Sequence, residues 1–314
     1  MKNIVKSVKN LIYTNQNSSI DAISRRILVS SNCQTGGLSA ALQVLLPEDR
    51  VIPLPLPNFS NENDELKFIE KLNGTDVWIT IGQYHLLEKH KVNDRIQIVK
   101  IPRIRIAAFH PDLIYLRRTS TNELVDPHYN SAIAAWAYKN NFDVSDTLKL
   151  FNGRIYAELG YLNSWATGTA ALKQIFDETD IDFTEFILGA RREGLFMYSL
   201  NHPKVQVLVR LAKLIALRIG ADKSVMDKAV DINDGLNDVI WPLYPEIGDG
   251  FAIPSTYEWK FGQVKWIKGL KTYLEFAFNN YSEQKIPRDD ISLVGVDERL
   301  YERVLGGQLG VNHD

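Results

Sequence analysis

The sequence predicts an α/β protein with a parallel-sheet core in its N-terminal half and a largely helical C-terminal half. In the first half, short β-branched runs alternate with helical patterns, as in parallel strands joined by crossover helices. These runs are almost continuously apolar, which is typical of strands buried on both faces. From residue 128 onward, long helical patterns replace them. We expect an α/β core over residues 20–128 and a mainly helical portion over residues 129–314, packed on the core rather than independent.

The first predicted unit is a strand, a turn and a helix. The strand covers residues 26–30 and the helix residues 38–46, because Pro47 cannot continue the backbone hydrogen-bond ladder. A polar turn joins the two elements. The other elements expected in the core are strands at residues 50–54, 76–81, 95–101 and 104–109 and a helix at residues 63–72, which makes about five strands in all.

The second half is predicted to consist mostly of helices. They are expected at residues 131–139, 144–151, 159–176, 183–198, 203–219 and 266–281. Pro203 suits a first helical turn, where its missing N–H is not needed, and Gly220 suits a left-handed C-terminal cap. Prolines and glycines in residues 241–256 predict an irregular loop.

The composition excludes several classes of protein. The chain has 314 residues, 45% of them hydrophobic and 24% charged, which is enough apolar material for a sizeable core. A formal net charge of -2 argues against a nucleic-acid partner. Residues 1–17 lack the apolar core of a secretory signal, and no apolar run approaches the ~18 residues that cross a bilayer. With one cysteine and no internal disulfide, we expect a soluble cytoplasmic protein without a membrane span.

The polar turn after the first strand is the most informative segment for function. Ligands bind at the carboxyl ends of strands in open α/β sheets, and Cys33 lies there, before a helix whose N-terminus favours a thiolate. It can serve as a nucleophile or a general acid or base. Asn32 and Gln34 can donate amide hydrogen bonds to an oxyanion, and Gly36 lets backbone N–H groups approach a ligand. A buried structural cysteine in a tight turn is the alternative.

Histidines follow two further predicted strands. His110 can activate a thiol or a hydroxyl, with Asp112 or another carboxylate orienting its ring, and His85 follows the strand at residues 76–81. A loop that leaves a strand explains His110 and Asp112 equally well. Weaker candidates, which caps or surface positions also explain, are His128, His202 and Ser131.

Several familiar motifs are missing from the sequence. Neither the Gly-x-Gly-x-x-Gly fingerprint nor the Gly-x-x-x-x-Gly-Lys phosphate loop occurs, which argues against a dinucleotide dehydrogenase or an NTPase. The chain also has no cysteine pair and no His-Glu-x-x-His segment for zinc. We therefore predict no metal site.

The segment Ser31-Asn32-Cys33-Gln34 after a short strand resembles the opening of the WcbI-type polysaccharide biosynthesis acetyltransferases, although Ser31 stands where that family usually carries glycine. Further similar blocks follow in the same order, within residues 27–245. They are Phe109-His110-Pro111-Asp112-Leu113 with Tyr115, the helix at residues 131–138, Leu159-Gly160-Tyr161 with Trp165, Asn201-His202-Pro203 and Trp241-Pro242-Leu243-Tyr244-Pro245.

This resemblance implies an α/β fold related to the SGNH-type hydrolases. It also implies binding of coenzyme A or acetyl-CoA and transfer of acetyl to a sugar hydroxyl in capsular or other surface polysaccharide. It places Cys33 at the thiol end of the cofactor, with Asn32 and Gln34 around the acyl group. His110 then acts as the base, and His85 is a looser match. Arginines near enough in sequence to be considered for the CoA phosphates are Arg103, Arg105, Arg117 and Arg118.

Two mechanisms and two other functions stay open at this stage. Acetyl can pass directly to the acceptor, or through a thioester on Cys33 with ping-pong kinetics. An esterase of the same broad fold would use Ser30 or Ser31, and a non-catalytic carbohydrate or protein interaction module would use exposed aromatic rings. The acceptor sugar and the oligomeric state are not predicted.

Overall fold

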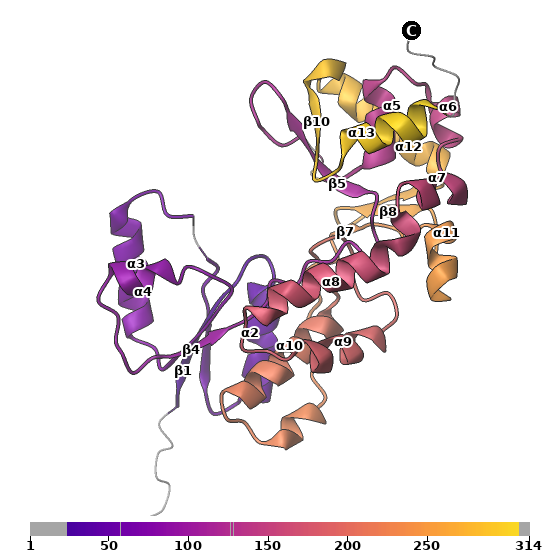
Figure 1. Ribbon diagram of the computed structural model, residues 1–314. Helices are drawn as coiled ribbons and strands as arrows, with labels where there is room; N and C mark the ends of the chain where they lie inside the picture. The colour runs from indigo at the N-terminus through magenta and orange to yellow at the C-terminus, as the bar shows by residue number, and fades with distance from the viewer. Residues whose placement is uncertain (1–23, 57, 126, 128, 308–314) are drawn as a thin grey trace, which may run out of the picture.

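The computed structural model describes residues 24–56, 58–125, 127 and 129–307. The polar N-terminal segment and His128 lie outside this part of the chain. Figure 1 shows a bent molecule, with α3 (Glu62–Asn73) and α4 (His85–Lys89) at one end and α5 (Ala132–Lys139), α12 (Leu270–Glu283) and α13 (Glu298–Tyr301) at the other. The long helix α8 (Ser164–Asp177) runs between the two ends.

The N-terminal half contains the predicted parallel sheet. Its strands are β1 (Arg26–Ser30), β2 (Arg50–Pro53), β3 (Val77–Thr80) and β4 (Gln97–Lys100). They pair in the order β2-β1-β3-β4, and every pair is parallel. The mixed α/β class predicted from the sequence is therefore confirmed.

Both faces of this sheet are buried, which explains its continuous apolar runs. Ile27 and Val29 of β1 pack in one apolar cluster with the inner side of α2 (Thr35–Leu45). Leu28, between them, joins a second cluster with residues of α3 and α4. Successive side chains of a strand point to opposite faces, so helices must cover each side of the sheet.

The expected fifth strand at residues 104–109 is wrong. The segment is buried, but its backbone groups bond outside any ladder. The Ile106 amide donates to the Leu200 carbonyl oxygen at 2.9 Å, and the Ile104 carbonyl accepts from the Gln34 side chain at 2.8 Å. A loop and a side chain thus satisfy the polar groups that a neighbouring strand would otherwise bind.

The chain after the parallel sheet carries more β-structure than predicted, and one of the added strands lies before residue 128. One antiparallel sheet has the order β10-β5-β6 and another the order β7-β8-β9. Their strands are β5 (Leu113–Arg118), β6 (Asn130–Ser131), β7 (Val239–Ile240), β8 (Glu258–Phe261), β9 (Lys265–Lys268) and β10 (Ile291–Val294). The remaining helices are α6 (Val144–Leu148), α7 (Gly153–Glu158), α9 (Phe183–Arg191), α10 (Val205–Arg218) and α11 (Pro245–Gly248).

Helix boundaries differ from prediction where glycine or proline changes the backbone. Trp266 lies in β9 instead of the last predicted helix, because Gly269 has a φ of 89° and separates β9 from α12. Pro203 precedes α10 and pairs with Met197 in an isolated bridge. Gly220 does have the predicted left-handed conformation, with a φ of 93°.

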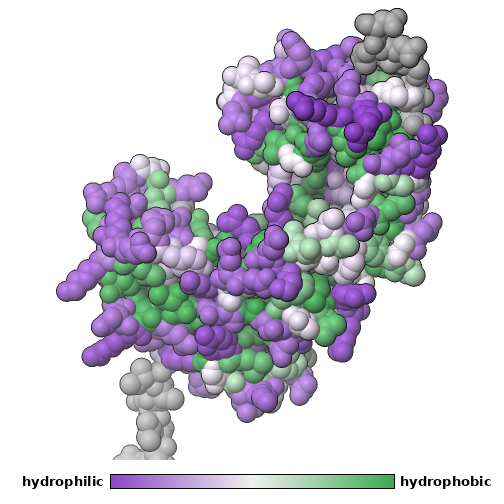
Figure 2. Space-filling view, in the orientation of Figure 1, coloured by the Kyte–Doolittle hydropathy of each residue, from purple (hydrophilic) through white to green (hydrophobic). Residues whose placement is uncertain are grey.

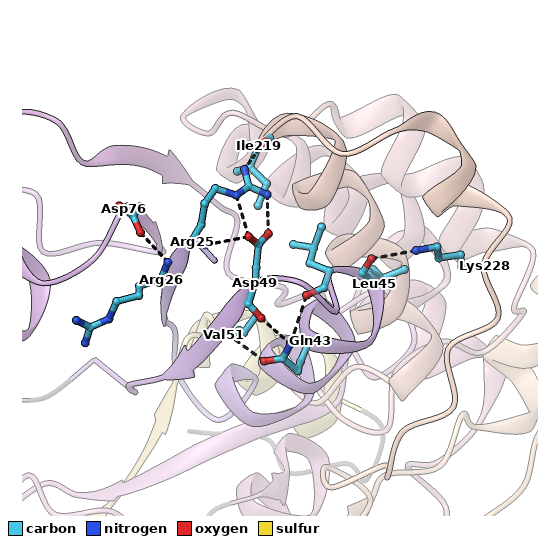
Figure 3. A network of polar contacts seen from close by, with 10 residues as sticks. Arg25, Arg26, Gln43, Leu45, Asp49, Val51, Asp76, Ile219 and Lys228 are labelled. Carbon is cyan, nitrogen blue, oxygen red and sulfur yellow. Dashed lines mark hydrogen bonds and ion pairs between the residues drawn. The ribbon is translucent and has the colours of Figure 1, made fainter. Parts of the chain in front are cut away.

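An arginine clamp joins the edge of the parallel sheet to the end of α10. Figure 3 shows the Arg25 guanidinium between the Asp49 carboxylate and the main chain of Ile219. It donates to both carboxylate oxygens, at 3.1 and 2.6 Å, and to the Ile219 carbonyl oxygen at 2.8 Å. A cation beside the carbonyl end of a helix also favours the helix dipole.

Replacing Asp49 by alanine is expected to lower the free energy of unfolding by about 1–3 kcal/mol, because the Asp49 side chain is only 11% exposed and its arginine partner loses a bidentate acceptor. Urea unfolding of the variant measures this loss. The matched control is Glu70→Ala on exposed surface of α3, which should change stability by less than about 0.5 kcal/mol. Equal stability of the two variants would contradict a stabilising role for the arginine clamp.

The face seen in Figure 2 is predominantly polar, with small separate apolar patches and a hollow between the two ends of the molecule. Among the described helices, none is long and apolar enough to cross a bilayer.

Candidate active site

Cys33 lies in the turn between β1 and α2 and is exposed, so the buried structural cysteine considered from the sequence is wrong. The turn is held by its own residues. The Ser31 amide donates to Thr35 Oγ1 at 3.1 Å, and the Thr35 amide donates to the Asn32 carbonyl oxygen at 3.0 Å. Ser31 does not have a positive φ, so serine fits the position where the family usually carries glycine.

Cys33 lines a cavity of about 500 Å³, which we call the Cys33 cavity. Its walls come from the β1–α2 turn, from β5 and the segment after it, and from the segment just before α10. The region around β7 and the end of β8 complete the lining. The other lining residues are Tyr115, Pro127, Tyr129, Asn201, His202, Asp238, Val239, Phe261 and Gly262. A thiol, an imidazole and a carboxylate therefore line the same cavity.

His202 is the histidine that lines this cavity. Its Nδ1 atom lies 3.6 Å from Asp238 Oδ1, and its ring meets the edge of Tyr129 with centroids 5.9 Å apart. Burial lowers the pKa of His202, although the charge of Asp238 opposes the shift. The ring is therefore neutral near pH 7 and can accept a proton.

Burial also raises the pKa of the Cys33 thiol, and Asp238 adds to the shift, while the Cys33 backbone amide and the charge of Arg103 oppose it. Cavity walls displace water from a thiol even where the residue keeps an exposed surface. The expectation that the start of α2 favours a thiolate is therefore wrong in its net effect. A base must remove the proton before this sulfur can attack.

A tyrosine–asparagine pair forms part of the same wall. The Tyr129 hydroxyl donates to Asn201 Oδ1 at 2.5 Å, and burial raises the pKa of Tyr129, which keeps this hydroxyl protonated. The main chain of Asn201 is held by Gln34, because the Asn201 carbonyl oxygen accepts from Gln34 Nε2 at 3.1 Å.

Gln34 is buried and has a structural role. Its amide nitrogen donates to the carbonyl oxygens of Ile104 and Asn201, at 2.8 and 3.1 Å. Both amide hydrogens are thus engaged by the backbone, which leaves neither for the oxyanion role expected from the sequence.

We expect Gln34→Leu to lower the free energy of unfolding by about 2 kcal/mol, because two buried carbonyl groups lose their donor. Chemical unfolding and a rate measurement on the same sample test this role. The control is Gln43→Leu, which removes a side chain bonded to the backbone at the partly exposed sheet edge. A normal stability with a large loss of activity would favour the oxyanion role instead.

Asn32 keeps a free donor for the cavity region. Its Oδ1 accepts from the Gln34 amide at 3.1 Å, and its amide nitrogen has no hydrogen-bond partner in the described part of the chain.

The two glycines of α2 differ in their surroundings. Gly36 is exposed, with open space around it, whereas Gly37 permits close packing: a Cβ atom there would lie 2.7 Å from Leu208 Cδ1 of α10. The helix contact thus requires Gly37 more than Gly36.

His110 and Asp112 are both buried, and they bond to different partners. His110 Nδ1 lies 3.3 Å from the Pro242 carbonyl oxygen, and Nε2 has no hydrogen-bond partner among the described residues. Burial lowers the pKa of His110 to about 4, opposed by the carbonyl groups of Pro242 and Met197. His110 is not among the residues that line the Cys33 cavity.

The Asp112 carboxylate is the centre of a buried tyrosine network. It accepts from the hydroxyls of Tyr161 and Tyr244, at 2.9 and 2.7 Å, and from the Ile133 amide at 3.0 Å. Burial raises its pKa to about 6, although hydrogen bonds, including one from Ser131, oppose the shift. Asp112 therefore holds tyrosines and the start of α5, not the His110 ring.

The other predicted residues lie on separate elements. Ser131 is the N-cap of α5 and accepts from the Ala134 amide at 3.1 Å, as one of its two sequence interpretations predicted. His85 is exposed at the start of α4, outside the lining of the Cys33 cavity. The arginines Arg103 and Arg105 are exposed, and Arg117 donates to the Asn122 carbonyl oxygen.

Sequence reasoning missed Asp238, Tyr129 and Asn201. Asp238 is 205 residues from Cys33 in the chain, and no local motif surrounds it. Asn201 lay inside a block that pointed to the family, which was the available signal. Within the described residues, no three His, Cys, Asp or Glu side chains gather closely enough to hold a metal ion.

A parallel sheet with a cysteine beyond the end of β1, and a histidine and a carboxylate in the lining of the same cavity, is the architecture of an α/β enzyme. The family model for the polysaccharide biosynthesis enzyme WcbI matches residues 26–224. The chain belongs to this family, which confirms the resemblance noted in the sequence.

One solved structure of WcbI, described as a novel polysaccharide biosynthesis enzyme, shares the fold. Its TM-score is 0.68 at 18% sequence identity, and the alignment covers 91% of this chain and 96% of that one. That structure is described as native protein without a disulfide bond between CoA and a cysteine. No curated protein matches the chain.

Proposed function

We propose that this protein is a CoA-dependent acyltransferase that moves acetyl from acetyl-CoA to a sugar hydroxyl during surface polysaccharide biosynthesis. The observation that carries the proposal is the Cys33 cavity, which is lined by an exposed cysteine, a neutral histidine and a carboxylate. Membership of the family supports it, and so does the description of the similar structure, which names CoA together with a cysteine and says that no disulfide joins them. A relation to the SGNH-type hydrolases and a cytoplasmic location belong to the same proposal.

In the direct mechanism, His202 accepts the proton of the sugar hydroxyl while its oxygen attacks the thioester carbonyl. The Asn32 amide donates to the oxyanion, and the carbon–sulfur bond then breaks. The departing CoA thiolate takes the proton back from His202, and the acetyl ester remains on the sugar. Asp238 stabilises the imidazolium that exists between the two proton transfers.

In the covalent mechanism, His202 removes the Cys33 proton, and the sulfur attacks acetyl-CoA. CoA leaves as a thiol with that proton. His202 then accepts the proton of the sugar hydroxyl, whose oxygen attacks the acetyl-cysteine; the acetyl–sulfur bond breaks, and the Cys33 thiolate takes the proton from His202. The raised pKa of Cys33 makes this mechanism depend on His202 as the base, because little thiolate exists without one. Neither His110 nor His85 lines the Cys33 cavity, so each could act as the base only if binding of the acceptor placed its hydroxyl beside that histidine.

An esterase that uses Ser30 or Ser31 has less support. Both serines are at most 1% exposed, whereas Cys33 beside them is exposed. A buried hydroxyl cannot reach an ester without movement of the turn. Arg103, Arg105 and Arg117 are the candidates for the CoA phosphates; Arg103 and Arg105 are exposed, and Arg117 already donates to the Asn122 carbonyl oxygen.

Calorimetric titration with CoA and acetyl-CoA tests the proposal, with a nucleotide that lacks the pantetheine arm as the ligand control. We expect saturable binding that needs the arm and that Cys33→Ala alters. A second measurement uses CoA disulfide: the Cys33 thiolate attacks one sulfur, a mixed disulfide forms and one CoA thiol is released. Mass spectrometry should find that adduct on Cys33. Absence of both binding and adduct would favour the interaction-module alternative.

A further inference from the structure

A second cavity, of about 630 Å³, lies outside the Cys33 cavity and takes no part in the proposed chemistry. We call it the Trp165 cavity, and it is built from α8, the end of α9 and the segment around α11. Its lining includes Phe109, Trp165, Arg191, Glu246 and Phe251. This volume falls within the range of small-molecule sites, about 300–1,000 Å³.

Three aromatic rings form an apolar wall in this cavity. The Phe109 ring centroid lies 5.7 Å from that of Trp165 and 5.5 Å from that of Phe251, and Trp165 and Phe251 meet edge to face at 5.7 Å. Aromatic rings held in this way offer C–H and π surfaces to the apolar side of a ligand.

A cation stands over this wall. The Arg191 guanidinium lies 5.2 Å from the Trp165 ring centroid, and its side chain forms no hydrogen bond or ion pair with any described residue. The guanidinium thus lies over the ring, and its N–H groups have no partner among the described residues. That arrangement suits a bidentate contact with a carboxylate or a phosphate.

An acceptor lies elsewhere in the same lining. Glu246 Oε2 accepts from the Tyr257 hydroxyl at 2.9 Å, which holds the carboxylate in place, and its other oxygen has no partner in the described part of the chain. Glu246 and Arg191 are not ion-paired with one another within that part. The cavity thus presents a carboxylate oxygen that can accept a hydrogen bond and a guanidinium that can bind an anion, both beside an apolar wall. A ligand that satisfies both groups must carry a hydroxyl donor and an anionic group.

We propose that the Trp165 cavity binds an acidic saccharide unit, a pyranose that carries a carboxylate or a phosphate. Its anion pairs with Arg191, its hydroxyls donate to Glu246, and its C–H face packs on the aromatic wall. The assignment rests on the proposed function in one respect, because a polysaccharide acceptor is the saccharide that such an enzyme meets.

Two chain segments line both cavities. The segment between α9 and α10 carries Gly194 in the Trp165 cavity and Asn201 and His202 in the Cys33 cavity. The segment from β7 to α11 carries Asp238 in one cavity and Glu246 in the other. A saccharide in the Trp165 cavity therefore contacts two segments of the chain that also carry the proposed reacting groups.

The test uses the full-length protein and three probes, glucuronate, glucose 6-phosphate and glucose, with binding followed by ligand-observed NMR. We expect both acidic sugars to bind at least about tenfold more tightly than glucose. Arg191→Gln should remove this preference, and Glu246→Ala should weaken all three probes. The matched control is Arg192→Gln, which removes the same charge one residue later, outside the Trp165 cavity.

Equal binding of the three sugars, or equal losses in the Arg191→Gln and Arg192→Gln variants, would overturn the inference. Competition by CoA that depends on Arg191 would also overturn it, because the cavity would then hold the nucleotide end of the cofactor. CoA binding is measured on the same samples. CoA binding without saccharide binding would contradict this inference alone. Saccharide binding without CoA binding would contradict the proposed transferase and would still support the saccharide site.

Discussion

Replacement of His202 by alanine is expected to lower the rate of acetyl transfer about a hundredfold or more, while CoA still binds. General-base catalysis by a positioned histidine contributes about 10²–10⁴-fold, and His202 is the histidine that lines the Cys33 cavity beside Asp238. Steady-state rates and CoA affinity, measured on one preparation, separate the loss of catalysis from a loss of binding.

The comparison variants decide which histidine acts. His85→Ala should keep the full rate, because His85 is exposed on α4 and does not line the cavity. Asp238→Asn should retain the base and lose part of the rate, since the imidazolium loses its carboxylate. A His202→Ala enzyme with normal turnover would exclude His202 as the base and would favour His110 in that role.

The pH profile gives a second check on His202. Its pKa is lowered below the ordinary 6.5, so the ring stays neutral as the pH falls to that value. The acid limb of kcat/KM should therefore lie below pH 6.5 and should be absent from the residual activity of His202→Ala. An acid limb above 6.5 would mean that another group controls the rate.

Replacement of Asp112 by alanine is expected to destabilise the protein by about 3 kcal/mol or more. The hydroxyls of Tyr161 and Tyr244 and the Ile133 amide would lose their common buried acceptor. Unfolding in urea measures the loss. Tyr161→Phe removes one donor and leaves the carboxylate with its other partners, so it should cost clearly less.

The Asp112→Asn variant isolates the pH dependence of this group. The pKa of Asp112 is raised from 3.8 to about 6 in the folded protein, so the folded state binds the proton more tightly and loses stability as the pH rises through that window. The size of the effect is about 3 kcal/mol. His110 acts in the opposite direction: its pKa is lowered from 6.5 to about 4, and stability is lost as the pH falls through that window.

These two buried groups therefore offset each other in the wild type between about pH 4 and pH 6. The asparagine variant keeps only the histidine contribution, so its stability should rise with pH over that range while that of the wild type changes less. The cost of Asp112→Asn is then largest at the acid end. Asp227→Asn, on the exposed surface, is the control and should follow the wild type. Parallel curves for wild type and Asp112→Asn would contradict a raised pKa at Asp112.

Much of the N-terminal half could be predicted, because its information is local. Each strand of the parallel sheet is a short apolar run, and each helix has a 3.6-residue pattern and an end signal such as Pro47. Residues 104–109 were the exception. Their apolar run is the mark of burial, and burial alone does not distinguish a strand from an irregular segment held by Gln34 and Leu200.

The candidate site was predictable only in part. The sequence located Cys33 at the end of β1, since the strand and the helix on either side can be read directly. It favoured His110 as the base and gave His202 as a weaker candidate, although both precede proline and both lie in blocks that resemble the family. Their separation is a matter of burial: His110 is 1% exposed, whereas His202 reaches the cavity.

The sequence by itself determined the class of fold, the position of the cysteine and the family, because each depends on residues that are neighbours in the chain. Only the tertiary structure decided what stands opposite the cysteine. Asp238 and His202 reach the Cys33 cavity through segments far along the chain, and the aromatic wall beneath Arg191 brings together Phe109, Trp165 and Phe251. Contacts over such separations follow from how helices and sheets pack, and packing is set by the whole core at once.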